Sequence, residues 1–181
     1  QQVRPGRHGR PFTLRKFRSM ADRFDEHGRP LPDERRLTSL GRLLRRTSLD
    51  ELPELWNVVK GDMSLVGPRP LLSRYVPYYR EEERARFDVR PGITGWAQVH
   101  GRNDLPWDDR LALDVWYVRH LSPGLDIRII WMTIARVLGS HGVQVVPALA
   151  MRDLDEERRL ATPARAEASG IHPAGGPLHA D

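Results

Sequence analysis

The chain has 181 residues, enough to bury one core, so a single domain is expected. Its net charge is +5, and arginine supplies nearly all of the positive charge, a bias explained equally well by phosphate recognition and by genome base composition. The absence of cysteine excludes disulfides, thiolate metal sites and a cysteine nucleophile. The sequence has no signal peptide and no apolar run of about 18 residues or more, so we expect a soluble or membrane-peripheral protein.

The N-terminal part of the chain is expected to contain a strand, a loop and a short helix. Residues 4–10 form a basic turn, and residues 12–20 alternate between apolar and polar side chains, as a strand does. Glycine and proline in residues 22–33 predict an irregular loop. Thr38 is placed to cap a helix over residues 39–46, where leucines recur on one face.

A second helix is predicted to begin at Ser48 and to run to about Lys60, where Gly61 stops it. Ser48 and Glu51 have the spacing of a capping box, in which the two side chains satisfy amides at the helix start. Asp50, in the first turn, would interact favourably with the helix dipole. Helix capping alone accounts for these residues without any function.

The same stretch also suggests a site for a metal and a phosphate. Asp50 and Glu51 are adjacent carboxylates at a helix start, and phosphate binds at such places. Arg69 stands between Pro68 and Pro70, whose fixed φ angles restrict its backbone. Carboxylates near a fixed arginine suit Mg²⁺ and diphosphate. The helix start and nearby arginines are expected to lower the pKa of Asp50.

The second half of the chain is predicted to be mostly helical. An amphipathic helix is expected over 75–87, a turn, strand and turn over 90–102, and a helix over 108–121. Residues 125–138 are apolar nearly all round but too short and too charged to span a bilayer. A buried core helix is the first interpretation, and a helix lying in a membrane interface is the alternative. Residues 146–181 lack apolar periodicity and are predicted to be a disordered tail.

Four segments together resemble the bacterial sugar transferases, the monotopic phosphoglycosyl transferases. They occur in the family's order and cover roughly residues 1–140. The resemblance implies a helix-dominated α+β fold with small β-hairpin elements and amphipathic interfacial helices, and a catalytic domain over residues 1–145. It also favours the membrane interface over the core for the helix predicted at 125–138. The matching segments are Lys16-Phe-Arg-Ser-Met20, Ser48 to Leu72, Arg90 to Arg102, and Leu113-Asp-Val-Trp-Tyr117.

The resemblance also implies a reaction. The chain would transfer a sugar 1-phosphate from a nucleoside diphosphate sugar, usually UDP-linked, to a polyprenyl phosphate at the cytoplasmic face of the bacterial inner membrane. This step begins exopolysaccharide, capsule or O-antigen assembly. Asp50 would be the nucleophile that forms an acyl phosphate and releases UMP, and Glu51 would share Mg²⁺ with Asp50 and assist as acid or base. The basic residues expected around the diphosphate and nucleotide are Lys16, Arg45, Arg69 and Arg102.

Two other functions are weighed against this one. Family members carry a hydrophobic re-entrant helix ahead of the segment that matches residues 2–6, and this sequence lacks it. The alternative is therefore an inactive remnant without its anchor, which would act as a binding or partner module. Nucleic acid is not an expected partner, because the basic residues stand singly among acidic ones. The expected partners are a UDP-sugar, a polyprenyl phosphate and the lipid surface, whereas the sugar and any homo-oligomer are left open.

Overall fold

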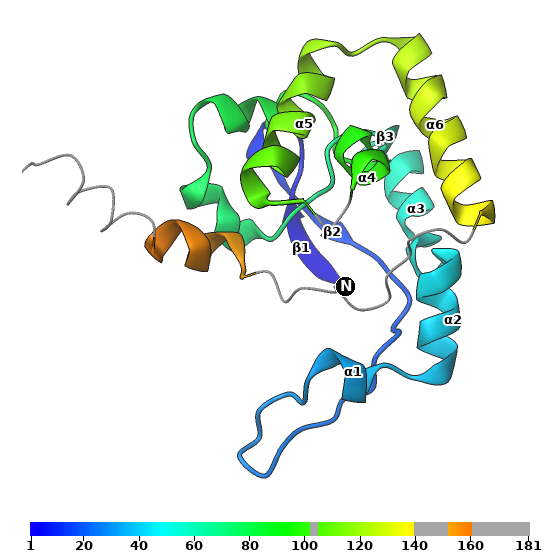
Figure 1. The fold of residues 1–181 in the computed structure, drawn as a ribbon, viewed down its shortest axis with the longest axis vertical. Helices are drawn as coiled ribbons and strands as arrows, with labels where there is room; N and C mark the ends of the chain where they lie inside the picture. The colour runs from blue at the N-terminus through cyan, green and yellow to red at the C-terminus, as the bar shows by residue number, and fades with distance from the viewer. Residues whose placement is uncertain (102–104, 140–151, 161–181) are drawn as a thin grey trace, which may run out of the picture. The chain divides into compact units, whose positions relative to one another are not determined.

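The structure is a computed structural model that describes residues 1–101, 105–139 and 152–160 (Figure 1). These residues belong to two compact units, which divide between residues 151 and 152. In its described residues, the first unit contains two small sheets of two strands each, and helices make up most of the regular structure. The predicted fold class, a helix-dominated α+β domain, is therefore confirmed.

The elements follow one another in short segments along the chain. The strands are β1 (Gln2–Pro5), β2 (Pro11–Leu14), β3 (Ser64–Val66) and β4 (Gly92–Thr94). The α-helices are α1 (Asp33–Arg36), α2 (Ser39–Thr47), α3 (Glu54–Val59), α4 (Trp96–His100), α5 (Trp107–Arg119) and α6 (Pro123–Leu138). The 3₁₀ helices are η1 (Arg7–Gly9), η2 (Leu49–Glu51), η3 (Ser73–Tyr78) and η4 (Glu82–Phe87).

The strands β1 and β2 form an antiparallel hairpin that packs one face on the core. Phe12 and Leu14 of β2 are buried in a hydrophobic cluster with Met63. The strand predicted over residues 12–20 is shorter than expected. It ends at Leu14, which lies opposite Gln2, the first residue of β1.

The helix predicted over residues 39–46 is confirmed as α2, together with its cap. The amide of Gly41 donates to the hydroxyl oxygen of Thr38 over 2.9 Å. Gly41 also lets another segment pass close by, because a Cβ at this position would lie 1.8 Å from the carbonyl oxygen of Ser19. The segment that follows Lys16 is therefore held against α2.

The prediction of a single helix from Ser48 to Lys60 is wrong. Ser48 adopts a left-handed conformation with φ 57° that ends α2, and the chain makes the turn η2 before α3 begins at Glu54. The hydroxyl of Ser48 caps no amide of the described chain, so the predicted capping box with Glu51 does not form. The backbone of this turn is instead tied to a distant segment, because the amide of Phe17 donates to the carbonyl oxygen of Asp50 over 3.0 Å.

The strands β3 and β4 are parallel and bring two distant stretches of sequence together. The amide of Gly67 donates to the carbonyl oxygen of Thr94 over 2.9 Å. The amide of Gly92 donates to the carbonyl oxygen of Pro68 over 3.0 Å. A Cβ on Gly92 would lie 2.1 Å from the amide nitrogen of Gly67, so only glycine fits this approach. Arg69 follows immediately, and the contact therefore fixes the start of its segment.

The region between β3 and α6 differs in part from the prediction. The helix predicted over 75–87 is two 3₁₀ helices, η3 and η4, because Pro77 lies inside the segment and lacks an amide hydrogen. In the segment 90–102, β4 confirms the predicted strand, whereas the α4 helix replaces the second turn. The helix predicted over 108–121 is confirmed as α5, with Leu111 in the core.

The last long helix, α6, confirms the helix predicted over residues 125–138, but only one of its faces belongs to the core. Ile129 is fully buried and packs with Val66, Val99 and Tyr117. Among the residues that the structure describes, no helix is long and apolar enough to cross a membrane. On the face of α6 opposite Ile129, the exposed apolar side chains are Ile127, Trp131, Ile134 and Leu138.

The predicted end of the catalytic domain at residue 145 lies outside the described residues. The same holds for most of the predicted tail, residues 146–181. Within this tail the structure describes residues 152–160, and residues 154–160 form a helix.

Candidate active site

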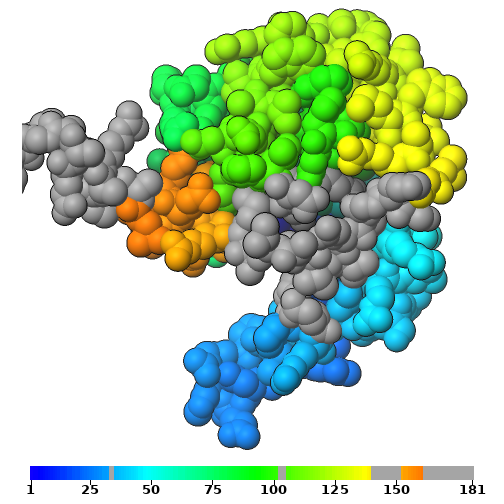
Figure 2. All heavy atoms as spheres, viewed as in Figure 1, coloured from blue at the N-terminus to red at the C-terminus, as the bar shows by residue number. Residues whose placement is uncertain are grey.

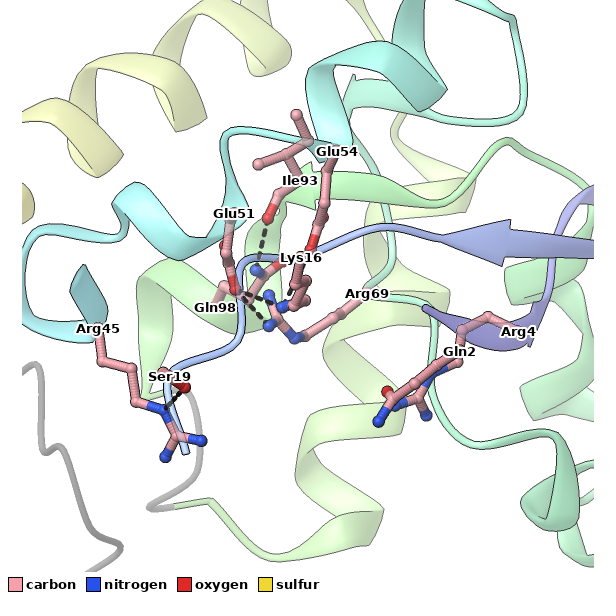
Figure 3. A network of polar contacts seen from close by, with 10 residues as sticks. All are labelled: Gln2, Arg4, Lys16, Ser19, Arg45, Glu51, Glu54, Arg69, Ile93 and Gln98. Carbon is pink, nitrogen blue, oxygen red and sulfur yellow. Dashed lines mark hydrogen bonds and ion pairs between the residues drawn. The ribbon is translucent and has the colours of Figure 1, made fainter. Parts of the chain in front are cut away.

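Three segments that are far apart in sequence meet at the carboxylate of Glu51 (Figure 3). The Nζ atom of Lys16 donates to Oε1 of Glu51 over 2.8 Å, and Nη2 of Arg69 donates to the same oxygen over 2.5 Å. Lys16 lies just after β2 and Arg69 just after β3, so each of the two sheets positions one of the cations beside Glu51. The structure thus brings together three of the predicted site residues.

The environment of Glu51 keeps this carboxylate ionised. Its side chain is only 13% exposed. Burial acts to raise the pKa of Glu51, but the charges of Arg69 and Lys16 outweigh burial and lower the pKa to about 2. Glu51 is therefore a fixed negative charge at neutral pH, held in place from two sides.

The other predicted carboxylate, Asp50, lies in the same turn but has a different environment. It is half-buried, and no side chain of the described residues forms a hydrogen bond or ion pair with its carboxylate. Burial raises the pKa of Asp50 and the charge of Glu51 raises it further, while Lys16 and Arg45 act in the opposite direction. The expected lowering of this pKa is therefore wrong, because Asp50 stands in a half-buried 3₁₀ turn and not at the start of a long helix.

A third acid belongs to the same group and was not predicted as a site residue. The side chain of Glu54 is 2% exposed, and its Oε1 lies 2.9 Å from Nζ of Lys16. Burial raises the pKa of Glu54, although Lys16 and Arg69 oppose this shift. The only signal in the sequence is the spacing of four residues from Asp50, which gives no indication of burial.

A second buried network fixes the backbone of Arg69. The guanidinium of Arg86 donates to the carbonyl oxygen of Arg69 over 2.6 Å. It also donates to the Asp114 carboxylate over 3.0 Å and to the Tyr79 hydroxyl over 2.7 Å. Arg86 and Asp114 are both buried, so η4 and α5 together position the segment that carries Arg69. Sequence reasoning placed Asp114 only in a matching motif and gave it no role.

The two remaining predicted arginines have different outcomes. Arg45 lies at the edge of the group, where its Nε donates to the hydroxyl of Ser19 over 3.0 Å, and it contacts neither Asp50 nor Glu51 through a hydrogen bond (Figure 3). Its charge still acts on the pKa of Asp50. Arg102 lies outside the described residues, so its predicted role stays a prediction.

The carboxylates of Asp50 and Glu51 are candidate ligands for Mg²⁺. Mg²⁺ binds through one or two carboxylates together with substrate phosphates and water. In residues 1–101, 105–139 and 152–160 no group of three or more acidic or histidine side chains forms a closed metal cage. Asp50 and Glu51 are adjacent carboxylates and so supply the type of ligand that this open mode uses, in which phosphate and water complete the coordination.

The sequence of this chain is similar to those of known proteins. The family model described as bacterial sugar transferase matches residues 1–140. The uncharacterized sugar transferase EpsL of Bacillus subtilis is 58% identical over 144 residues, which are 80% of this chain and 71% of EpsL. The undecaprenyl-phosphate galactose phosphotransferase of Salmonella typhimurium is 41% identical over 156 residues, which are 77% of this chain and 33% of that protein.

A third relative has a similar identity and coverage. The UDP-glucose:undecaprenyl-phosphate glucose-1-phosphate transferase of Xanthomonas campestris is 44% identical over 151 residues, again 77% of this chain but 31% of that protein. The chain therefore spans most of EpsL and about a third of the other two relatives. With a match over residues 1–140 that includes every segment of the site, the chain belongs to the bacterial sugar transferase family.

Proposed function

We propose that this chain transfers a sugar 1-phosphate from a UDP-sugar to a polyprenyl phosphate, with Asp50 as the nucleophile. The names of the Salmonella and Xanthomonas relatives describe transfer of sugar phosphates to undecaprenyl phosphate, which supports this class of reaction. The transfer would supply the first lipid-linked sugar for an exopolysaccharide, a capsule or an O-antigen.

The observation that carries the proposal is the contrast between the two adjacent acids. Glu51 is held by Lys16 and Arg69, whereas Asp50 has no such partner among the described side chains. A nucleophile needs a free electron pair and a fixed direction of attack. The Asp50 carboxylate is not engaged by any described side chain, and its backbone is held by the Phe17 amide, so it can attack while Glu51 stays in place.

The proposed reaction has two displacements at one phosphorus atom. In the first, a carboxylate oxygen of Asp50 attacks the sugar-linked phosphorus, and the bond from this phosphorus to the bridging oxygen breaks. UMP leaves with that electron pair, and Asp50 holds the sugar phosphate as an acyl phosphate. In the second, a phosphate oxygen of the polyprenyl phosphate attacks the same phosphorus and releases the Asp50 carboxylate.

The basic residues would stabilise the negative charge in both steps. Phosphoryl transfer depends mainly on position and on charge stabilisation. Arg69 and Lys16 already lie within hydrogen-bond distance of Glu51, next to the attacking group. Mg²⁺, held by Asp50, Glu51 and the diphosphate, would neutralise charge on the phosphate oxygens.

The chain would act at a lipid surface, since one of its substrates is a lipid. Apolar side chains at i, i+3, i+4 and i+7 are exposed from Leu52, just after η2, to the end of α3, and a second exposed row lies on α6. Figure 2 shows α6 in yellow and the α2–α3 region in cyan on the same side of the first unit. We infer that these rows lie in the membrane interface. The exposed residues of the first row are Leu52, Leu55, Trp56 and Val59.

The proposal is tested by trapping the intermediate. The protein in phospholipid nanodiscs would be mixed with Mg²⁺ and one UDP-sugar at a time, and intact-mass analysis would detect a phosphosugar adduct while a coupled assay measures UMP. We expect an adduct with at least one sugar, and loss of about a thousandfold or more in UMP release for Asp50→Asn. An adduct that persists in Asp50→Asn would exclude Asp50 as the nucleophile. Neither adduct nor UMP with any sugar would contradict the transferase and favour a binding module.

A further inference from the structure

The hairpin carries a charged residue on the side that faces the core. In an antiparallel pair, residues opposite one another project to the same face. Arg4 lies opposite Phe12, which is buried in the core cluster with Leu14. Val3 projects to the other face and is 60% exposed. The usual alternation is thus inverted in β1, with an arginine directed inward and a valine outward.

The guanidinium of Arg4 has little to compensate its charge. Its Nε is buried and has no hydrogen-bond partner among the described residues. Its Nη2 donates to the neutral side-chain amide of Gln2, and none of the described carboxylates forms an ion pair with it. Arg4 as a whole is half-buried and its Nη2 is exposed, but the buried Nε lacks the partner that buried donors normally have, and an unsatisfied buried donor is costly. This cost suggests that a partner arrives with a ligand.

The electrostatic surroundings of Arg4 point in the same direction. Burial lowers the pKa of Arg4, and the positive charge of Arg69 lowers it further. In Figure 3, Arg69 lies between Arg4 and the carboxylate of Glu51. Arg69 uses Nη2 for Glu51, and its other guanidinium nitrogens have no acceptor in the described part of the chain. Both guanidinium groups have donors without an acceptor in the described part of the chain, and the charge of Arg69 acts on Arg4. Such donors suit a phosphate, which accepts several hydrogen bonds.

We propose that Arg4 is a phosphate-binding residue of the active site and that it shares one phosphate group of a substrate with Arg69. This inference rests on the proposed function, which supplies phosphate from two sources. One source is the diphosphate of the UDP-sugar, and the other is the phosphate of the polyprenyl acceptor. The anion would supply the missing acceptor for Nε of Arg4 and reduce the repulsion between the two arginines.

The test measures binding and does not depend on turnover. Isothermal titration of the whole chain with UDP, and separately with farnesyl phosphate, would compare wild type with Arg4→Gln, Arg4→Lys and Arg10→Gln. Arg10→Gln is the matched control, because Arg10 is exposed in the same hairpin and the charge change is identical. We expect Arg4→Gln to weaken at least one ligand about tenfold or more. Arg4→Lys should recover part of the loss, and Arg10→Gln should stay within about twofold of wild type.

The outcomes separate the two phosphate sources. Weaker binding of UDP alone assigns Arg4 to the sugar donor, weaker binding of farnesyl phosphate alone assigns it to the acceptor, and weaker binding of both assigns it to a shared position. Wild-type affinity of Arg4→Gln for both ligands overturns the proposal. An equal loss in Arg10→Gln, or a wild type that binds neither ligand, overturns it as well.

Urea unfolding without ligand tests whether a loss of binding arises from destabilisation of the fold. Arg4→Gln removes an unpaired charge next to Arg69, so this variant should be at least as stable as wild type. If Arg4→Gln is less stable than wild type, Arg4→Lys becomes the deciding variant. It keeps the positive charge, and the proposal requires that it still bind the phosphate ligand more weakly than wild type. The inference can fail while Asp50 still forms its adduct, so its failure is distinct from that of the proposed function.

Discussion

The Nζ atom of Lys16 lies 2.8 Å from the carboxylate of Glu51, which is 35 residues away in the sequence. The contact joins the segment after the hairpin to the turn that carries Asp50. Because Arg69 approaches the same carboxylate oxygen, Glu51 is the point at which three segments are connected. This arrangement makes the ionisation of Glu51 a property of the tertiary structure, with measurable consequences.

The first prediction concerns the pH dependence of stability. The pKa of Glu51 is about 2 in the folded chain against an ordinary value of 4.5, so its ion pairs stabilise the fold fully above pH 4.5. This contribution, about 3 kcal/mol by order of magnitude, is lost as the pH falls from 4.5 towards 2. Urea unfolding across this range should show a steeper acid loss for wild type than for Glu51→Gln. Identical slopes would show that Lys16 and Arg69 do not act on Glu51 as the structure indicates.

Glu54→Gln is the matched comparison, because the substitution is the same and the expected sign is opposite. Burial raises the pKa of Glu54, so the neutral form favours folding and that contribution is lost as the pH rises above 4.5 towards the folded value. Relative to wild type, Glu54→Gln should therefore become more stable as the pH rises through this range. A difference that stays constant with pH would contradict a raised pKa at Glu54.

The second prediction concerns the close approach of β3 and β4. A Cβ on Gly92 would lie 2.1 Å from the amide nitrogen of Gly67, so Gly92→Ala forces the strands apart. We expect this variant to lose more than about 2 kcal/mol of unfolding free energy. Gly124→Ala in α6 is the control, because no atom lies within 4 Å of its added Cβ, and it should gain about 0.5–1 kcal/mol. Equal thermal stability of the two variants would contradict the packing.

The third prediction concerns the buried pair Arg86–Asp114. Asp114→Asn leaves the Arg86 charge buried with a neutral partner, and breaking such a pair costs about 3 kcal/mol or more. The same change in the exposed pair Arg18–Asp22 should cost about 1 kcal/mol or less. Denaturant unfolding of Asp114→Asn and Asp22→Asn measures both. Because Arg86 donates to the backbone of Arg69, Asp114→Asn should also slow UMP release, whereas Asp22→Asn should leave the rate unchanged.

The fourth prediction concerns the exposed apolar row on α6. Trp131 is 67% exposed, and replacing it with a charge should oppose insertion into a lipid interface. In liposome co-sedimentation, Trp131→Glu should lower the bound fraction, and combining it with Ile127→Glu should lower it further. Val3→Glu is the control, since Val3 is an exposed apolar residue on the outer face of the hairpin. An equal loss for Val3→Glu would assign the effect to net charge and not to the α6 face.

Sequence patterns predicted correctly those elements whose hydrogen bonds form within one segment of the chain. The cap of α2 by Thr38 and the helices α5 and α6 follow from spacing within one segment, and all three are confirmed. The pattern at Ser48 failed because a capping box is only a local preference. Here the left-handed Ser48 and the hydrogen bond from Phe17 to the Asp50 carbonyl shape the turn, and Glu51 has stronger partners than a backbone amide.

The sequence by itself determined that Asp50 and Glu51 are adjacent, that Arg69 stands between two prolines, and that the chain resembles the bacterial sugar transferases. Only the tertiary structure decided which acid is paired and which has no partner among the described side chains, because Lys16 and Arg69 reach Glu51 through two separate sheets. The burial of Glu54, the pair Arg86–Asp114 and the inward position of Arg4 also depend on contacts between distant segments. Neighbouring residues in a chain fix which groups are available, whereas burial and charge pairing depend on what the fold places around them.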